Sequence, residues 1–261
     1  MGILNVTPDS FSDGGKFIKS NIAVDHAFKM IDDGAHIIDI GGESTRPGSV
    51  PISDVEECER ILPVIDKIKK IDSNITVSVD TYKASVAKKA IEAGADIIND
   101  ISGLTFDPEM LSLLSGKNIP VIIMHINGKP KTMQNNPVYD DLIEDIKSFL
   151  YHQSKVAEES GIKKDHIILD PGIGFGKTFD HNFTLLRRLD EICSLGYPVM
   201  IGPSRKAFIG DALDLPIDER IEGTIATIVA GIINGAKIVR VHDVKEVSRA
   251  VKITEKIITK A

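Results

Sequence analysis

The stretch Ile167–Thr178 reads IILDPGIGFGKT: a short apolar run ends at a carboxylate, Asp170, and a proline and three glycines follow. This order predicts a buried strand that carries an acid into a Gly-rich loop. The two common phosphate motifs do not fit, since the P-loop needs glycine at Pro171 and the dinucleotide motif needs it at Lys177. Glycines that admit a close backbone approach, beside a strand-end acid, suggest a flat ligand held at one end of a parallel sheet. The alternative is an ordinary βα turn with a solvated acid.

Short apolar runs alternate with amphipathic segments along the whole chain. We expect strands at Gly2–Val6, Ile37–Gly41, Thr76–Asp80, Ile97–Asp100, Val121–Met124, Ile167–Asp170, Val199–Gly202 and Ile238–Val241. We expect helices from after Asn21 to Gly34, from a capping box at Ser53 and Glu56 to about Ile71, and at Lys83–Ala93, Tyr139–Gly161, Asn182–Leu195, Glu219–Asn234 and Val244–Ile258. This alternation indicates parallel pairing of the strands, with helices covering the sheet.

A repeated pattern marks three junctions between helix and strand: Gly34–Asp39 (GAHIID), Gly94–Asn99 (GADIIN) and Gly235–Arg240 (GAKIVR). Because side chains alternate along a strand, Asp39, Asn99 and Arg240 should point the same way, into a barrel mouth. Polar groups there would be costly without a ligand or partners. Together with the length of 261 residues, the pattern favours an α/β fold, a (β/α)8 TIM barrel forming a single domain over residues 1–261. A doubly wound open sheet is the alternative.

Composition narrows the classes of partner. The formal net charge of -7 is spread over interspersed acidic and basic residues, which offers no basic face for nucleic acid. Cys58 and Cys193 lack metal-ligand spacing and fit a reducing compartment, so we expect free thiols and no disulfide. No apolar run approaches the ~20 residues of a membrane span, and no leader-like segment precedes the first strand. We therefore expect a soluble, cytoplasmic protein with no membrane partner.

The polar residues at the predicted strand ends fall into two chemical groups. Asp80, Asn99 and Asp170 supply carboxylates and one amide, which suit a flat heterocycle with an amidine-like edge. The second group is cationic and polar and is better matched to phosphate oxygens with a divalent ion. It consists of Asn5, Ser44, Thr45, Arg46, Arg240 and His242.

At these residues the chain resembles the bacterial dihydropteroate synthase family of the pterin-binding barrel superfamily. The motifs that carry the resemblance span the chain in family order. They are GILNVTPDSFSDGG (Gly2–Gly15), GGESTRPGS (Gly41–Ser49), SVDTYK (Ser78–Lys83), INDISG (Ile98–Gly103), LDPGIGFGKT (Leu169–Thr178), GPSRKAFIG (Gly202–Gly210) and RVHDV (Arg240–Val244). The resemblance implies that a dihydropterin-CH2-diphosphate is joined to 4-aminobenzoate, with release of diphosphate, in folate biosynthesis.

Residue roles follow from the resemblance by motif position. It implies that Asp80, Asn99, Asp170 and Lys206 hydrogen-bond the pterin, and that Met124 and Phe175 form walls of the pocket. It implies that Asn5 ligates Mg2+, and that Thr45, Arg240 and His242 hold the diphosphate. Phe11, Asp13 and Pro47 would close over the aminobenzoate. The residues nearest the chemistry would be Asn5, Asp13, Lys206 and Arg240, with charge stabilisation and positioning in place of a protein nucleophile.

Two departures from the family pattern concern Ala207 and the start of the chain. Family members often carry Ser where Ala207 stands, so a backbone N–H would serve the aminobenzoate carboxylate instead. The family usually has a segment ahead of this first strand. The resemblance also implies a homodimer formed through barrel helices, and substrate mimicry makes sulfonamide inhibition an expectation.

Three other functions compete with the synthase. A pterin-dependent corrinoid methyltransferase or a noncatalytic pterin-binding module would have no need for the phosphate group formed by Arg240, His242 and the STRPG loop. A Schiff-base aldolase would use Lys206 as its nucleophile. The position of Lys206 after Ser204 and Arg205, in a loop, favours a hydrogen-bonding cation over a nucleophile.

Overall fold

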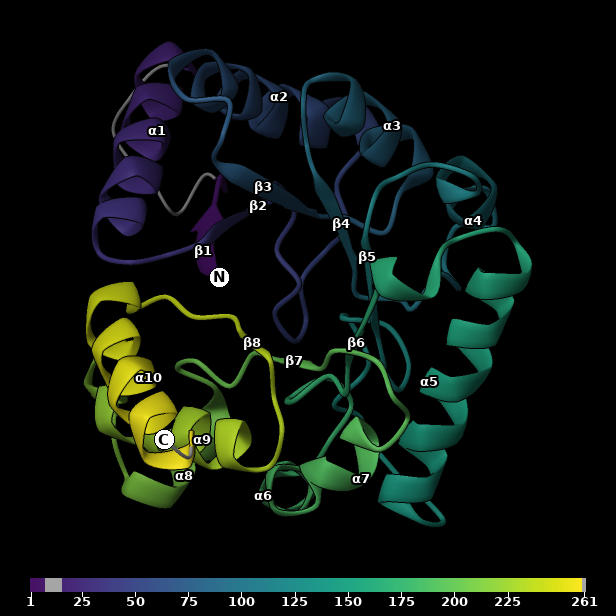
Figure 1. Cartoon of the computed structure of the whole chain (residues 1–261), viewed down its shortest axis with the longest axis vertical. Helices are drawn as coiled ribbons and strands as arrows, with labels where there is room; N and C mark the ends of the chain where they lie inside the picture. Colours follow the sequence, from purple (N-terminus) through teal and green to yellow (C-terminus); the bar gives the residue numbers. More distant parts are fainter. Residues whose placement is uncertain (8–15, 260–261) are drawn as a thin grey trace.

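The computed structural model describes residues 1–7 and 16–259, and its strands form a closed parallel barrel surrounded by helices (Figure 1). Six strands pair in chain order: β1 (Gly2–Asn5), β2 (Ile37–Gly41), β3 (Thr76–Asp80), β4 (Ile97–Asp100), β5 (Val121–Met124) and β6 (Ile167–Asp170). Two short strands, β7 (Met200–Ile201) and β8 (Ile238–Val239), pair with each other. Parallel bridges join Leu169 to Val199 and Gly2 to Val241, which closes the ring. The closure confirms the (β/α)8 barrel and rules out the doubly wound sheet.

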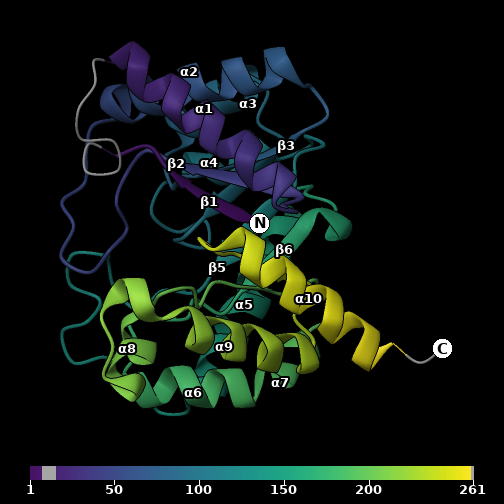
Figure 2. The ribbon, with the colours of Figure 1, turned by 90° about the vertical axis from the view of Figure 1, so that its left-hand side faces the viewer.

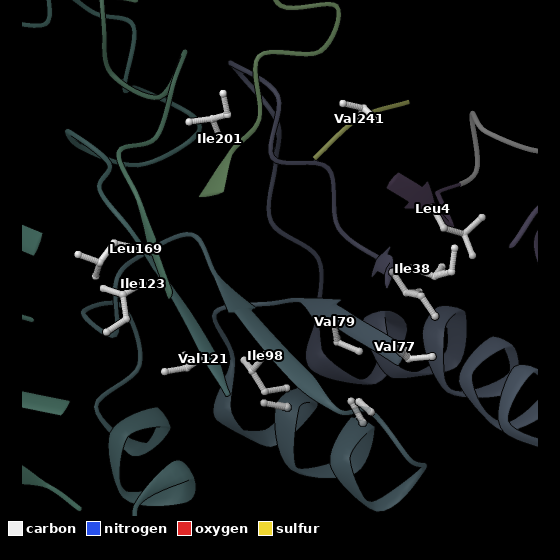
Figure 3. Close-up of a cluster of buried hydrophobic side chains, with 14 of the residues drawn as sticks. Leu4, Ile38, Val77, Val79, Ile98, Val121, Ile123, Leu169, Ile201 and Val241 are labelled. Atoms are coloured by element: carbon white, nitrogen blue, oxygen red, sulfur yellow. The ribbon is translucent and has the colours of Figure 1, made fainter. Parts of the chain in front are cut away.

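Alternate strand residues serve two different cores. One set faces the helices and forms the large core drawn in Figure 3, which includes Leu4, Ile38, Val79, Ile123 and Leu169. The other set fills the barrel. At the end where the strands begin, it is a layer of Ile97, Ile122, Ile168 and Met200, packed against Met1, Ile37 and Ile238. This layer is apolar, and a polar layer follows it toward the strand ends.

The helices that cover the barrel are α1 (Lys16–Asp32), α2 (Asp54–Ile71), α3 (Ala84–Glu92), α4 (Glu109–Leu114), α5 (Leu142–Glu159), α6 (Phe179–Arg187), α7 (Leu189–Cys193), α8 (Ala207–Leu213), α9 (Ile221–Ile233) and α10 (Val244–Ile258). Short 3-10 turns occur at η2 (Lys164–His166) and η3 (Ile217–Glu219). The helices α4 and α8 were not predicted from the sequence. No helix in the described part of the chain is both long and apolar enough to cross a membrane.

Three local predictions about the helices need correction. Asn21 does not cap the first helix, which already begins at Lys16, and its side chain accepts a hydrogen bond from Lys67. Ser53 caps α2 by accepting from the backbone N–H of Glu56, but the Glu56 carboxylate pairs with Arg60, so only half of the capping box forms. The helix predicted at Asn182–Leu195 breaks at Arg188.

A side chain from another helix satisfies the carbonyl groups that the break between α6 and α7 leaves free. A helix that ends leaves its last carbonyl groups without intrahelical partners. The side-chain amide of Asn234 donates to the carbonyl oxygen of Leu186 at 2.8 Å and to that of Arg187 at 3.4 Å. A contact from a distant helix end thus stabilises a kink that the local sequence did not reveal.

Two long loops extend from the end of the barrel where the strands finish. Loop 2 (residues 42–53) follows β2, and the loop of residues 125–138 follows β5. Figure 2 shows both on the left of the view, on the same side of the barrel. They touch, since the backbone N–H of Gly48 donates to the carbonyl oxygen of Pro130 at 3.1 Å.

Candidate active site

A polar cluster lies inside the barrel at the carboxyl ends of the strands. The guanidinium of Arg240 donates through Nε to Asp39 Oδ2 at 2.6 Å and through Nη2 to Asp80 Oδ2 at 2.8 Å. The amide nitrogen of Asn99 donates to the same Asp39 oxygen at 3.2 Å. The repeat-based prediction that Asp39, Asn99 and Arg240 point the same way is confirmed. Their mutual contacts give partners to Asp39 Oδ2, to the Arg240 guanidinium and to the Asn99 amide nitrogen, while Asp39 Oδ1 has no hydrogen-bond partner in the described residues.

The sequence repeat predicted the direction of the Asp39 side chain, but no function was predicted for this residue. Its side chain is completely buried, and its carboxylate can only accept hydrogen bonds when ionised. The amide of Asn99 must therefore turn its nitrogen toward Asp39 and leave its oxygen free. Asp39 thus fixes both the guanidinium of Arg240 and the hydrogen-bonding sense of Asn99.

Acceptor atoms at this cluster remain unused. Asp80 Oδ1 and Asn99 Oδ1 are buried and have no hydrogen-bond partner in the described part of the chain. Asp170 accepts from the backbone N–H of Gly172 at 2.7 Å through one oxygen. Buried acceptors without partners are costly, so they fit a ligand that brings several N–H donors on one edge.

Burial also shifts the charges of this cluster. Burial raises the pKa of Asp80 to about 7, and Arg240 opposes the shift while Asp39 adds to it. The pKa of Asp170 is raised by burial as well, against the hydrogen bond from Gly172 and the positive charge of Lys206. Desolvation lowers the pKa of Lys206 to about 7, with Asp170 acting in the opposite direction. A donor-rich ligand would hold both carboxylates in their ionised form.

The Gly-rich loop after β6 packs tightly on the chain that follows β5. A Cβ on Gly172 would lie 1.9 Å from the carbonyl oxygen of His125, and one on Gly176 would lie 2.4 Å from that of Asn127. Both glycines have positive φ, 68° and 65°. The predicted close backbone approach is present, but it is made by the neighbouring loop. At Gly172 and Gly176 the glycines therefore shape the site, and the ligand is not the group that approaches them.

Lys206 and Phe175 meet above this loop. The ammonium of Lys206 donates to the carbonyl oxygen of Ile173 and lies 4.6 Å from the centroid of the Phe175 ring. Met124 packs with Phe175 in a small apolar cluster that also contains Ile101 and Met133. Lys206, Met124 and Phe175 are thus brought together as predicted, with Lys206 engaged as a hydrogen-bonding cation.

Lys177 is a buried residue of the site whose burial the sequence did not reveal. Only 1% of its surface is exposed, and its ammonium lies 3.0 Å from both His125 Nδ1 and the carbonyl oxygen of Phe175. Burial lowers its pKa to about 7, and burial followed by the charge of Lys177 lowers the pKa of His125 to about 2. His125 is therefore neutral and accepts from Lys177. A lysine in a Gly-rich loop gives no sequence signal of such burial.

The predicted phosphate-binding group lies at the ends of β1 and β8 and on loop 2. The hydroxyl of Ser204 lies 3.0 Å from His242 Nδ1 and accepts from the backbone N–H of His242 at 3.1 Å. Burial, followed by the charge of Arg240, lowers the pKa of His242 to about 4. His242 is therefore a neutral imidazole near pH 7. The positive charge expected of this group comes from Arg46 and Arg240 and not from the histidine.

A cavity of about 670 Å³ opens over the cluster, within the size range of small-molecule sites. The predicted residues that line it are Asn5, Ser44, Thr45, Arg46, Pro47, Asp80, Phe175, Lys206, Arg240 and His242. Asn99, Met124 and Asp170 are buried and do not line the cavity. Lys177, Ser204 and Ala207 also line it. Phe11 and Asp13 lie outside the residues that the structure describes.

Asn5 occupies the position predicted for a metal ligand, beside Gly41. A Cβ on Gly41 would lie 3.7 Å from Asn5 Oδ1 and 3.8 Å from Asp80 Oδ2, so the two oxygens flank this glycine. In the described residues no group of three or more His, Cys, Asp or Glu could hold a metal ion by itself. An amide oxygen on the wall of the cavity fits Mg2+, which commonly takes few protein ligands and completes its shell with substrate phosphate and water.

Comparisons with known proteins agree along the whole chain. A family model described as pterin binding enzyme matches residues 1–242. The dihydropteroate synthase of Bacillus subtilis is 52% identical over 260 residues, which is 100% of this chain and 88% of that protein. The crystal structure of the Clostridium difficile dihydropteroate synthase with pteroic acid has 48% identity and a TM-score of 0.94, covering 100% of this chain and 96% of that one.

A third relative is also similar over the whole of this chain. The Xanthomonas albilineans dihydropteroate synthase, solved with 4-aminobenzoic acid, has 38% identity and a TM-score of 0.93. The match covers 100% of this chain and 93% of that one. Both the sequence relatives and the structural neighbours are therefore similar from end to end.

Proposed function

The chain belongs to the dihydropteroate synthases, the pterin-binding transferases of folate biosynthesis, and we propose a role in catalysis for each part of its site. The enzyme condenses (7,8-dihydropterin-6-yl)methyl diphosphate with 4-aminobenzoate and releases diphosphate. The observation that carries the assignment of the pterin subsite is the pair of buried, unpartnered acceptors, Asp80 Oδ1 and Asn99 Oδ1.

The pterin lies on the strand-end cluster, with its 2-amino and ring N–H donors directed to acceptors. Asp170 takes two of these donors, while Asp80 and Asn99 take others through the oxygens that Asp39 and Arg240 leave free. Lys206 donates to the pterin carbonyl or ring nitrogen from its place over Phe175, 4.6 Å from the ring. Phe175 provides an apolar wall, with Met124 packed against it, that excludes water and strengthens these hydrogen bonds.

The diphosphate lies between β1, β8 and loop 2. Arg240 supplies the positive charge, while Thr45 and the neutral His242 supply hydrogen bonds. Mg2+, held by Asn5 and by diphosphate oxygens, would neutralise negative charge on the leaving group.

The aminobenzoate enters last, above Lys206, and is closed in by Pro47. Ala207 offers no side-chain hydroxyl, so its backbone N–H serves the carboxylate. The neutral amine of the aminobenzoate attacks the exocyclic CH2 of the pterin while the C–O bond to diphosphate breaks. The electron-rich pterin stabilises positive charge at that carbon, and the amine then loses a proton. Catalysis thus consists of positioning and charge stabilisation.

The competing functions are less well supported by the contacts in the site. A Schiff-base lysine must be free to attack a carbonyl, whereas the ammonium of Lys206 donates to the Ile173 carbonyl and lies over an aromatic ring. A corrinoid methyltransferase or a noncatalytic pterin-binding module would have no use for Arg240, His242 and Ser204 beside the pterin subsite. We therefore retain the synthase.

We also propose that the protein assembles as a homodimer and resides in the cytoplasm. Apolar side chains on the outer helices, including Ile233 of α9 and Ile253 of α10, are 60% and 61% exposed and could be covered by a second copy. Cys58 and Cys193 are both free thiols, as a reducing compartment allows. Gel filtration with light scattering measures the mass of the assembly.

The test of the function is a direct assay. The protein is incubated with the pterin diphosphate, 4-aminobenzoate and Mg2+, and the release of diphosphate and formation of dihydropteroate are measured. Release should require all three components. A sulfonamide analogue of aminobenzoate should compete with it. Release of diphosphate at the same rate without aminobenzoate would indicate a hydrolase and contradict the proposal.

A further inference from the structure

The two ends of loop 2 meet at a single ammonium group, that of Lys83. Its Nζ lies 2.7 Å from Glu43 Oε2, 2.7 Å from the carbonyl oxygen of Ile52, and 2.7 Å from Glu57 Oε2. Glu43 is at the start of loop 2, Ile52 is near its end, and Glu57 is in the first turns of α2. An ammonium has three N–H donors, and here each has one acceptor. Lys83 therefore joins the beginning and the end of the loop at one point.

Glu43 completes this junction, which we call the loop 2 anchor (Glu43, Ile52, Glu57, Tyr82 and Lys83). Its Oε2 accepts from the backbone N–H of Ile52 at 2.9 Å, and its Oε1 accepts from the Tyr82 hydroxyl at 2.7 Å. The backbone N–H and carbonyl of Ile52 are thus both held. Glu43, Glu57 and Lys83 are only 8%, 1% and 9% exposed, so water screens these charges weakly.

The anchor is built on the segment that delivers Asp80 to the pterin subsite. Tyr82 and Lys83 stand in the short connection between β3, which ends at Asp80, and α3. That connection is fixed by its own backbone, since Thr81 N–H donates to the Asn99 carbonyl and Ala84 N–H donates to Asp107. Loop 2 is therefore anchored to the same rigid segment that carries the pterin acceptor Asp80.

Between its anchored ends, loop 2 reaches the cavity. Thr45, Arg46 and Pro47 line the cavity, and the Gly48 N–H at the tip of loop 2 donates to the Pro130 carbonyl of the neighbouring loop. A loop held at both ends loses less conformational entropy when its middle closes on a ligand than a loop with free ends. The anchor thus lowers the cost of closure.

We propose that Lys83 is a positioning residue for the second substrate: by pinning both ends of loop 2 to the end of β3, it sets where Thr45 and Pro47 meet the aminobenzoate. Lys83 does not touch either substrate. The inference rests on the proposed function, because it assumes that loop 2 closes over aminobenzoate. Loss of Lys83 should therefore weaken aminobenzoate use while leaving pterin binding in place.

Lys69 offers a matched control for any general loss of stability. Its Nζ donates to Asp96 Oδ2 at 2.6 Å and to the Ile75 carbonyl at 2.7 Å, and Asp96 in turn accepts from the Val77 N–H. The Lys69 side chain is 15% exposed, close to the 11% of Lys83. This pair ties α2 to the start of β3, at the opposite end of the barrel from the cavity.

The experiment compares Lys83→Met with Lys69→Met in the full chain. The kinetics of both substrates are measured, and calorimetry gives the affinity for 6-hydroxymethylpterin, a probe without diphosphate. For Lys83→Met we expect KM for aminobenzoate to rise about tenfold, within the usual range of coupling between sites. Pterin affinity should stay within about twofold. Lys69→Met should lower the unfolding temperature without changing KM. Equal KM in the two variants would overturn the proposal.

A fluorescence readout reports on loop 2 without catalysis. The chain has no tryptophan, and Val50 in loop 2 is 70% exposed, so Val50→Trp gives a single probe of the loop. Its anisotropy should fall in the Lys83→Met background and stay unchanged in the Lys69→Met background. Unchanged anisotropy in both would show that Lys83 does not hold the loop.

Removing one partner of a buried ion pair can prevent folding, so a second variant that removes both charges is also measured. Lys83→Met/Glu57→Leu removes one positive and one negative charge and keeps buried volume, while Glu43 retains Tyr82 and the Ile52 N–H. It should show the same rise in KM for aminobenzoate. If the double variant folds with normal KM, the proposal is wrong. If the wild-type protein releases no diphosphate in the direct assay, the proposed function itself has failed.

Discussion

The two ends of the barrel interior differ in chemistry although the same strands build both. Where the strands begin, Ile97, Ile122, Ile168 and Met200 form an apolar layer. Two positions farther along the same faces stand Asn99, Met124 and Asp170, with Asp39 and Arg240 from neighbouring strands. The first layer gains free energy by burial, whereas the second leaves acceptors without partners. In this barrel, the residues that stabilise the fold lie where the strands begin, and the residues that bind the ligand lie where the strands end.

The largest expected effect breaks the apolar layer. Ile122 is completely buried, so Ile122→Ala should lower the free energy of unfolding by about 3 kcal/mol through lost burial and a residual cavity. Denaturant unfolding measures this loss. Pterin affinity at a temperature well below unfolding should remain unchanged. A large loss of affinity together with the loss of stability would show that the two layers are not separate.

The complementary change is made in the polar layer. Asp170→Asn exchanges one acceptor oxygen for a donor that clashes with the pterin edge, and we expect a loss of pterin binding of about 2 to 4 kcal/mol. The fold should be retained, because the pKa of Asp170 is raised by burial and its charge is costly in the free protein. Calorimetry measures the affinity. Unchanged affinity would remove Asp170 from the pterin subsite.

The third prediction sharpens the contrast between strand ends and loops. Loop 2 touches the cavity through Thr45 and Pro47, while the pterin acceptors stand on strands. Aminobenzoate should therefore bind at least about tenfold tighter, a coupling of about 1.4 kcal/mol, when pterin and Mg-diphosphate are already present. Titration into the free and preloaded protein gives the ratio. Equal affinities would mean that the second subsite is formed before the first substrate binds.

The smallest expected effect concerns pH. Burial raises the pKa of Asp80 to about 7, so the free protein takes up a proton there as the pH falls below 7. A pterin that donates to Asp80 requires the carboxylate and loses affinity in that range. Between pH 8 and 6.5 the loss should be about fourfold, as expected for one proton with this pKa.

Asp80→Asn provides the control for the pH effect. Its lower pterin affinity should vary less between pH 8 and 6.5, because the titrating carboxyl group is gone. The raised pKa also means that the ionised Asp80 destabilises the free fold. Asp80 therefore contributes more favourably to the free energy of unfolding at pH 5 than at pH 8. An acid whose pKa is lowered by folding shows the opposite dependence. Unaltered pH dependence in the variant would assign the titration to another group, such as Lys206.

The success of the sequence-based prediction varied with the range of the interactions involved. Strand positions such as Ile37–Gly41 and Ile167–Asp170 were predicted correctly because a buried parallel strand is a continuous apolar run. Helix ends were less accurate. Asn21 has the composition of a cap but bonds to Lys67, and Arg188 interrupts a helix because Asn234 satisfies the freed carbonyls. Neither partner is near in sequence.

The features of the candidate site also divide into those predicted from local sequence and those that depend on distant contacts. Strand alternation and the repeated Gly-Ala junction placed Asp39, Asn99 and Arg240 on one face. The chemistry of the strand ends grouped Asp80 and Asp170 with Asn99, and motif resemblance added Lys206. The hydrogen bond that orients Asn99, the burial of Lys177 and the neutral state of His242 required the assembled barrel. Hydrogen-bonding sense and pKa depend on which groups surround an atom, and those groups come from distant strands.

The sequence by itself determined the fold class, the end of the barrel that carries the chemistry, and the family. Periodicity and motif order are local properties, and a parallel strand has few ways to bury a continuous apolar face. The tertiary structure alone decided that Asp39 is the common partner of Arg240 and Asn99, and that Lys83 joins the two ends of loop 2. These contacts link residues up to 201 positions apart, and only closure of the barrel brings them within hydrogen-bonding distance.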